Sequence, residues 1–493
     1  MAARKKAFYI LPGAYSMIGI GTIFRRRAGS GGPLPPDYAK WVKEHMVFWY
    51  DMSKPVDVYA ENFNDWTKFT GAKYTVTNKS VNITNFDAVN NASIYIAKSK
   101  KFNGITITVD GLLDGQEIAW GYNNDPLVRM PKNGTYTLEP INSVTGNIGF
   151  RSINIVGACN ITITQLPSGQ SVPTNEILKA NPYLQDFSGN NRPLKLNNFL
   201  FVAMSGVGGY DISSTNILPD RANVTVTDNR IIHITKKLST TDNMVNIVPS
   251  NSNPTHKFKV TGLSDGRQVS LVNRNGGFYT FDNGEHEVTL TYPEGTTSLY
   301  NTIGVTGDIG DMDVTIEFLP KYPNALVTDG VDDYGVVENF KSLQNYMMFF
   351  QCAIIRPNAV NGMFSTTPIK NDNNVRGWML LQGNFVNSVR FGNSRYKNFE
   401  FTPSVKDKIS YVLSANNELM TCYVGEEKAT LAETYKQTGA NMSLFLSDSN
   451  NKARFGSMAF YKSILFDSVP TKETDGFTEQ ELIDYVLENI ITQ

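Results

Sequence analysis

The sequence predicts an all-β protein of several domains, one of which is present twice. Apolar and polar residues alternate in many segments, as in residues 105–109, and this two-residue period is typical of antiparallel strands with one buried face. Asn-Gly pairs at Asn133-Gly134 and Asn283-Gly284 predict hairpin turns. Segments of similar sequence recur about 150 residues apart in the same order, which indicates a duplicated domain rather than a solenoid of short units.

Three pairs of similar segments define the duplication. They are residues 72–77 and 222–227, residues 111–118 and 262–269, and residues 160–167 and 313–320. Because the pairs keep one order and nearly one spacing, we predict two homologous inserted β-sandwich domains, at residues 55–170 and 215–320. The segment Tyr50-Asp51-Met52-Ser53 also resembles Tyr210-Asp211-Ile212-Ser213, so we expect the chain to enter both domains through equivalent junctions.

Length and composition limit the number and class of domains. A chain of 493 residues corresponds to about three domains. Charged residues make up 18% of the chain, below the roughly 25% typical of soluble domains, and the formal net charge is -1. The chain therefore lacks the basic surface that attracts nucleic acid or anionic membranes, and we expect no nucleic-acid partner.

The sequence shows no pattern for catalysis or cofactor binding. Its cysteines and histidines are too far apart in sequence for a disulfide framework, a zinc site or a catalytic triad; they are Cys159, Cys352, Cys422, His45, His233, His256 and His286. It has no phosphate-binding glycine loop. The carboxylates at Glu285, Glu287 and Glu426-Glu427 do not form the paired-carboxylate strand of a glycoside hydrolase. We predict that the protein is not an enzyme and assign no catalytic, cofactor or metal residue.

The N-terminal segment, residues 1–45, is predicted to be an anchoring arm and linker. An uncharged stretch at residues 7–24, between two basic clusters, approaches the length of about 20 residues that spans a bilayer, but Pro12 and Gly13 interrupt it. It is an arm that docks on a partner protein, a membrane anchor, or a segment without local order. Residues 28–36 are rich in glycine and proline and form a linker that separates the arm from the body.

The C-terminal third carries a series of motifs that resembles a known fold. The motifs are Leu326-Val327-Thr328-Asp329-Gly330-Val331-Asp332-Asp333-Tyr334, residues 408–412, residues 420–425, residues 456–462 and residues 478–482. Together they resemble the concanavalin A-like (laminin G-like) jelly roll over residues 324–493. One motif departs from the family pattern, because Gly425 directly follows Val424 without the usual aspartate between them.

The first two segments of that family are present but displaced along the chain. Residues 46–52 look like its opening strand, and Asp186-Phe187-Ser188-Gly189 with Leu194 looks like its next segment. The resemblance therefore implies one jelly roll, built from residues 46–54, 171–214 and 321–493 and split by the two inserts. Insertions are tolerated where the chain leaves and re-enters a domain at neighbouring loop ends.

The chain is expected to end in a short helix. Thr478 and Glu481 have the spacing of a capping box, in which each side chain bonds the other's backbone N–H group. Leu482, Val486 and Ile490 then fall on one helix face. We expect this face to pack against the jelly roll.

Two groups of residues are candidates for ligand binding. Asp329, Asp332 and Asp333 supply carboxylates that could hold calcium, which takes six to eight oxygen ligands, or they accept hydrogen bonds at a turn. Residues 371–378, which end at Trp378, could bind a glycan by stacking and amide contacts, or belong to a core strand. Both alternatives remain open for each group, and the ligand-binding residues are unknown.

The whole layout is similar to virion proteins of tailed phages that infect Bacteroidota, including crAss-like phages. The resemblance implies a head or tail fibre exposed on the virion, a homo-oligomer such as a trimer, attached to capsid or tail proteins through residues 1–45. Host surface polysaccharide would be its ligand. The alternative is a bacterial cell-surface carbohydrate-binding adhesin anchored by residues 7–24, and a third interpretation is a glycan-degrading enzyme.

Overall fold

The structure of the protein is a computed structural model that describes most of residues 37–492. The residues outside the description are 1–36, 90–91, 98–99, 123–124, 211, 228, 250–253, 265, 274–276, 291, 293–300, 339, 357–360, 367–378, 383–387, 393–395, 401–407, 417–418, 426, 433–441, 449–452 and 493. Most of the predicted arm, including residues 7–24, and the candidate segment 371–378 therefore lie outside the described residues.

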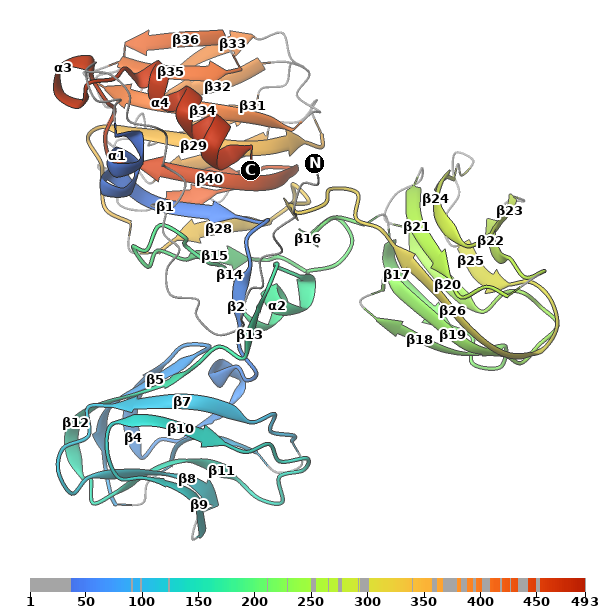
Figure 1. Cartoon of the computed structure of the whole chain (residues 1–493), viewed down its shortest axis with the longest axis horizontal. Coiled ribbons are helices and arrows are strands. Elements are labelled where there is room, and N and C mark those ends of the chain that lie inside the picture. The colour runs from blue at the N-terminus through green and yellow to red at the C-terminus, as the bar shows by residue number, and fades with distance from the viewer. Residues whose placement is uncertain are drawn as a thin grey trace, which may run out of the picture.

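The protein is all-β, as the alternation of its sequence predicted. Strands hold 54% of the residues and helices 9%, and every pairing between strands in the described sheets is antiparallel. The strands form three bodies (Figure 1), which we call the host sandwich, the first insert and the second insert. Among the described residues, no helix has the length and apolar character needed to cross a bilayer.

The host sandwich consists of two eight-stranded sheets. The first contains β16 (Gly206–Val207), β27 (Leu326–Val327), β40 (Met458–Phe466), β29 (Tyr346–Ile354), β34 (Ile409–Asn416), β35 (Leu419–Val424) and β36 (Glu427–Ala432), with β1 (Met46–Asp51) paired to β40. The second contains β14 (Tyr183–Leu184), β15 (Leu194–Asn197), β28 (Tyr334–Val337), β37 (Met442–Leu444), β30 (Asn361–Thr366), β31 (Met379–Gln382), β32 (Ser388–Gly392) and β33 (Tyr396–Glu400). A separate pair is β38 (Leu446–Asp448) and β39 (Ala453–Phe455).

Strand pairing confirms that the jelly roll is split. Strand β1 pairs with β40, so that Trp49 lies opposite Ile464, and β15 pairs with β28, where Leu196 lies opposite Gly335. The side chain of Phe48 is buried in the same core as strands β15 and β28. Sequence segments that precede each insert therefore complete sheets whose other strands follow both inserts.

The two inserts have the same architecture, two five-stranded sheets with equivalent strand orders. In the first insert the sheets are β4 (Ala72–Val76), β5 (Ser80–Phe86), β12 (Gly157–Gln165), β7 (Ile105–Asp110), β10 (Gly134–Leu138), and β3 (Thr67–Lys68), β6 (Ala92–Ile96), β11 (Ile148–Ile153), β8 (Glu117–Tyr122), β9 (Asp125–Met130). In the second insert they are β18 (Ala222–Thr227), β19 (Ile231–Lys237), β26 (Gly310–Phe318), β21 (Thr255–Thr261), β24 (Gly284–Thr289), and β17 (Ile212–Ile217), β20 (Val245–Pro249), β25 (Asn301–Val305), β22 (Val269–Asn273), β23 (Phe278–Phe281).

Local contacts repeat as closely as the strand order. In the first insert, the Leu112 N–H donates to Asn133 Oδ1 at 2.8 Å and Asn133 Nδ2 donates to the Leu112 carbonyl at 3.1 Å. In the second, Asn283 makes the same two bonds with Leu263, both at 3.0 Å. The Asn-Gly pairs thus begin strands β10 and β24 and also tie each hairpin to the neighbouring turn, and the predicted duplication is confirmed.

A buried apolar position of the first insert is occupied by a charged residue in the second. Phe86 ends β5 and is fully buried in the first insert, whereas fully buried Lys237 ends β19 in the second. The Lys237 ammonium is paired with Asp242 and donates to the carbonyls of Val305 at 3.0 Å and Gly307 at 2.7 Å. A buried charge is tolerated only with such partners, so this lysine replaces an apolar contact by a polar network.

The junctions of the two inserts are not equivalent, contrary to our expectation. Tyr50 lies in the host core and donates its hydroxyl to the Arg192 carbonyl at 2.6 Å, whereas Tyr210 packs against the core of the second insert. Strand β17 already begins at Ile212, so the boundary placed at residue 215 falls inside a strand. The first insert is joined instead by a ribbon of β2 (Val56–Val58) and β13 (Gly169–Ser171).

Helices pack against one face of the host sandwich. Helix α1 (Tyr38–His45) and helix α4 (Glu479–Val486) share a core with β29 and β40, and Trp41 Nε1 donates to Asp475 at 3.1 Å. Residues 38–45, which the sequence placed in the arm, therefore form a helix of the host. The remaining short helices are η2 (Phe63–Asp65), α2 (Asn175–Ala180), α3 (Lys472–Asp475) and η3 (Leu487–Ile491).

The predicted C-terminal capping box is confirmed. The Glu481 N–H donates to Thr478 Oγ1 at 3.3 Å, and the Thr478 N–H donates to the Glu481 carboxylate at 2.7 Å. Leu482 and Val486 are buried, as their spacing predicted. Glu479 on the same helix accepts from Tyr423 at 2.8 Å, which fastens the helix to strand β35.

Candidate ligand-binding cleft and acidic turn

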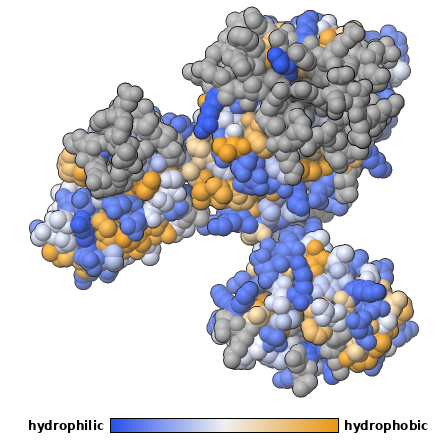
Figure 2. Space-filling model, turned by 180° about the vertical axis from the view of Figure 1, so that it is seen from behind, coloured by the Kyte–Doolittle hydropathy of each residue, from blue (hydrophilic) through white to orange (hydrophobic). Residues whose placement is uncertain are grey.

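A cleft of about 630 Å³ lies where the first insert meets the host sandwich. Hydrophilic residues gather at this neck in the space-filling view (Figure 2). Three segments form the walls: the ribbon strand β2 and its end, the β4–β5 turn of the first insert, and the host chain around β14. The lining residues are Val56, Asp57, Tyr59, Asn64, Val76, Thr77, Asn78, Lys79, Ser80, Ile177, Asn181, Tyr183, Gln185, Asp186, Gly189, Asn191, Pro193 and Glu338.

Hydrogen bonds across the neck hold these walls together. Asn62 Nδ2 donates to the carbonyl of Ala180 at the end of α2, at 2.6 Å, and the Asp57 N–H donates to Gln185 Oε1 at 3.3 Å. Thr174 caps α2 by accepting from the Ile177 N–H at 3.2 Å, so the helix starts at a defined position. The bonds of Asn62 and Asp57 join segments that are more than 100 residues apart in sequence.

Asp186 shapes the host wall of the cleft. Its carboxylate accepts from the N–H groups of Trp49 at 3.0 Å, Ser188 at 2.9 Å and Arg192 at 3.0 Å. A carboxylate with several backbone donors organises a turn. The structure therefore gives this aspartate, first noticed as part of a jelly-roll motif, the task of tying the turn after β14 to the opening strand β1.

The cleft lining suits a ligand with many hydroxyl groups. Tyr59 and Tyr183 supply aromatic rings, and the amides of asparagine and glutamine can both donate and accept. The buried Oδ1 of Asn181 has no hydrogen-bond partner. Burial, with the added effect of Asp57, raises the pKa of Tyr59 to about 12, so its phenol stays protonated at neutral pH. The volume falls within the roughly 300–1,000 Å³ of known ligand pockets.

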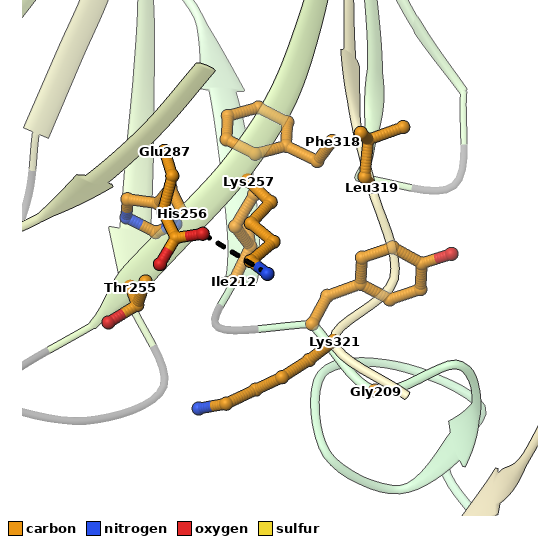
Figure 3. Close-up of a pocket in the computed structure, with 10 residues that line it drawn as sticks. Gly209, Ile212, Thr255, His256, Lys257, Glu287, Phe318, Leu319 and Lys321 are labelled. Atoms are coloured by element: carbon orange, nitrogen blue, oxygen red, sulfur yellow. Dashed lines mark ion pairs between the residues drawn. The ribbon is translucent and has the colours of Figure 1, made fainter. Parts of the chain in front are cut away.

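A smaller pocket of about 290 Å³ lies at the base of the second insert (Figure 3). Lys257 and Glu287, on neighbouring strands β21 and β24, form an ion pair at 3.1 Å at its wall. His256 is buried beside them, and its ring lies edge-on to Phe318 at 5.6 Å. Lys321 enters from the linker that leaves the insert. This volume is just below the usual lower limit for ligand pockets.

The three aspartates after β27 do come together. One carboxylate oxygen from each of Asp329, Asp332 and Asp333 lies within 4.8 Å of the others. Asp333 is fully buried and accepts from Ser205 Oγ and from the Asp329 N–H, both at 3.0 Å. Asp329 accepts from the Val331 N–H at 2.7 Å. The turn bonds expected of aspartate are therefore present, and calcium binding at this acidic turn stays a prediction.

Asp333 is expected to make stability depend on pH. Burial raises its pKa to about 7, with a further contribution from its acidic neighbours and an opposing one from its hydrogen bonds. Since an unfolded aspartate has a pKa of about 3.9, the folded state binds the proton more tightly. The contribution of Asp333 to the unfolding free energy is fully present below about pH 4 and is lost as the pH rises through about 7.

Urea unfolding at pH 5 and pH 8 tests this prediction. The unfolding free energy of the parent should fall towards pH 8, by at most about 1.4 kcal/mol for each unit of the pKa shift. In Asp333→Asn the unfolding free energy should change much less between pH 5 and pH 8 than in the parent. In the exposed control Asp332→Asn it should fall as much as in the parent. An equally large fall in unfolding free energy in Asp333→Asn contradicts the explanation by a buried proton.

The same unfolding measurement tests the acidic turn for calcium. Calcium that stabilises the parent at pH 8 but not Asp333→Asn indicates a calcium site.

The remaining residues considered in the sequence do not form one site. Cys159, Cys352 and Cys422 are all free thiols, as their spacing suggested. His45 bonds Asp467 at 2.9 Å, and His233 bonds Asp313 at 2.7 Å. Sequence reasoning missed the cleft, because Tyr59 and Tyr183 come from separate segments that carry no motif. Only the displaced segment near Asp186 pointed to this region.

Comparisons with known proteins give weak likenesses. No family model matches the chain, and no curated protein matches it. Among solved structures, a Trypanosoma rangeli sialidase in complex with the inhibitor DANA is 9% identical, covers 90% of this chain and 98% of its own, and has a TM-score of 0.27. The CBM40 domain of the Ruminococcus gnavus IT-sialidase bound to α2,3-sialyllactose is 13% identical and has a TM-score of 0.24. The match covers 27% of this chain and 80% of that chain.

The mouse laminin α1 chain domains LG4-5 are also among these structures, at 9% identity over 55% of this chain and 97% of that one, with a TM-score of 0.23. The matched structures thus include sialidases, a CBM40 domain and laminin LG domains. At these scores the likeness does not reach individual residues. The strand order and pairing described above establish the split sandwich independently.

Proposed function

We propose that this chain is a non-enzymatic surface protein that binds saccharide in the cleft between the first insert and the host sandwich. The cleft itself carries the proposal, because its two tyrosines, five amide side chains and hydroxyl groups line one concave surface. Aromatic rings pack on the apolar face of a sugar while neighbouring polar groups bond its hydroxyls. The pocket at the base of the second insert is smaller, about 290 Å³, and no asparagine or glutamine lines it.

The biological setting we propose is the virion of a tailed phage, exposed on the head or tail. The split jelly roll with twin inserts supports this, as does the low charge of the surface. Residues 1–36 precede the host sandwich and would attach it to capsid or tail proteins. Several copies, for instance three, would gain avidity for host surface polysaccharide, because linked weak sites bind more tightly together than singly.

Particles reconstituted with three forms of the chain test this function. The full chain should enter particles and make them adhere to host polysaccharide. A chain without residues 1–36 should stay out of the particles. The double variant Tyr59→Ala and Tyr183→Ala should enter normally but lose adhesion by at least tenfold, whereas the control Tyr136→Ala, on strand β10 and outside the cleft lining, should keep it.

Three results contradict the proposal. Undiminished adhesion by the cleft variant removes the cleft as the saccharide site. Recovery of the full chain with bacterial membranes, in cells that carry no phage, favours instead a cell-surface adhesin anchored by residues 7–24. A fall in polysaccharide viscosity on adding pure protein would show an enzyme.

A further inference from the structure

The charges around the cleft select among saccharides. Three carboxylates line it, those of Asp57, Asp186 and Glu338, against the single ammonium of Lys79. Arg192, which lies between two lining residues, adds one positive charge nearby. The lining residues themselves are therefore net negative, although the chain as a whole is close to neutral.

One cation lines the cleft, and it is a lysine on an exposed side chain. The ammonium of Lys79 lies 5.8 Å from the ring of Tyr59 on an exposed side chain. No arginine is among the lining residues, although arginine is the residue that binds carboxylates with two parallel bonds. An acidic sugar would thus meet three carboxylates in the lining and no guanidinium among the residues that line the cleft.

Two of the three carboxylates are held in place by hydrogen bonds. The Asp186 carboxylate accepts from three backbone N–H groups, which fix its position. Asp57 accepts from Gln170 Nε2 at 3.1 Å across the β2–β13 ribbon. Neutral hydroxyl groups can donate to these oxygens, but a ligand carboxylate cannot and is repelled by them.

We infer that the cleft takes a neutral oligosaccharide and discriminates against sialylated or uronic-acid glycans. This inference rests on the proposed function, since it names the class of saccharide for the same cleft. Amide and phenol groups bond the hydroxyls of the ligand, Tyr59 and Tyr183 pack on its apolar faces, and the carboxylates both accept hydroxyl hydrogens and exclude anions.

A paired glycan array tests the inference with the full chain. Each neutral oligosaccharide is printed beside a counterpart that differs by one sialic or uronic acid. We expect at least tenfold stronger binding to the neutral members. The double variant Asp57→Asn and Glu338→Gln should narrow that ratio several-fold, and so should higher salt, which screens the charges. The control Glu139→Gln, exposed on the first insert, should leave the ratio unchanged.

The outcomes separate the inference from the function beneath it. Equal or stronger binding to the acidic members overturns the neutral-sugar assignment while saccharide binding stands. A ratio that does not change in the Asp57→Asn and Glu338→Gln variant also overturns it, because another feature would then cause the selectivity. Binding to no glycan on the array, by the full chain and by its variants alike, overturns both the inference and the proposed function.

Discussion

Phe48→Ala is expected to unfold the host sandwich selectively. The Phe48 ring is fully buried and stacks on Tyr50 at 4.7 Å, in the strand that precedes the first insert. Truncating a buried phenylalanine removes apolar contacts and leaves a cavity, at a cost of about 3–5 kcal/mol. Because the strand completes a sheet formed by later segments, that loss should fall on the host and not on the neighbouring insert.

Hydrogen exchange with mass spectrometry measures where the loss occurs. In Phe48→Ala, amides of β29 and β40 should exchange faster, while those of β12 should keep the rate of the parent. The matched control is Phe150→Ala, also fully buried but within the first insert, where its ring lies 5.0 Å from that of Trp120. It should show the reverse pattern. Faster exchange in β12 caused by Phe48→Ala would contradict the split host.

Gly111→Ala is expected to destabilise the first insert strongly. A Cβ at Gly111 would lie 1.9 Å from the carbonyl oxygen of Asn160, and the residue has a φ of +89°. Both the backbone contact and the left-handed conformation therefore oppose a side chain. We expect a loss of more than about 3 kcal/mol, in the range that marks a specific structural conflict.

The same turn supplies the control for this prediction. Gly115 has a similar φ of +77°, but a Cβ there would meet nothing within 4 Å. Gly115→Ala should therefore cost only the left-handed strain, about 1–2 kcal/mol. Gly262→Ala and Gly266→Ala offer the same comparison in the second insert. A Cβ at Gly262 would lie 1.8 Å from the carbonyl oxygen of Asp313, whereas one at Gly266 would meet nothing within 4 Å. Equal losses from the two substitutions in denaturant unfolding would show that the close contact has no role.

Structural features that depend on residues close in sequence were predicted well. The alternation in residues 105–109 predicted β7, and the spacing of Thr478 and Glu481 predicted the capped helix α4. The recurring glycines and Asn-Gly pairs identified the duplication because a residue with positive φ, or an amide that bridges two turns, leaves a fixed requirement in the sequence. Such requirements involve neighbours only a few residues away, or repeat themselves in a second copy.

Similarity alone was misleading where the environment differed. Tyr50 and Tyr210 begin similar tetrapeptides, yet Tyr50 packs in the host core and Tyr210 against the second insert. The sequence predicted that residues 38–45 belong to the arm, but Trp41 and Val42 are buried against α4 and β40. In both cases the partner lies hundreds of residues away or in another body, and no local pattern records it.

The alternation, the duplicated turns and the displaced jelly-roll motifs by themselves determined that the chain is all-β, that one sandwich occurs twice and that a third is interrupted. Only the tertiary structure decided where a ligand can bind. The cleft exists because the β2–β13 ribbon, the turn around Lys79 and the segment near Tyr183 meet in space. Each wall is an ordinary polar segment in sequence, and the cleft arises from packing between segments that the sequence keeps apart.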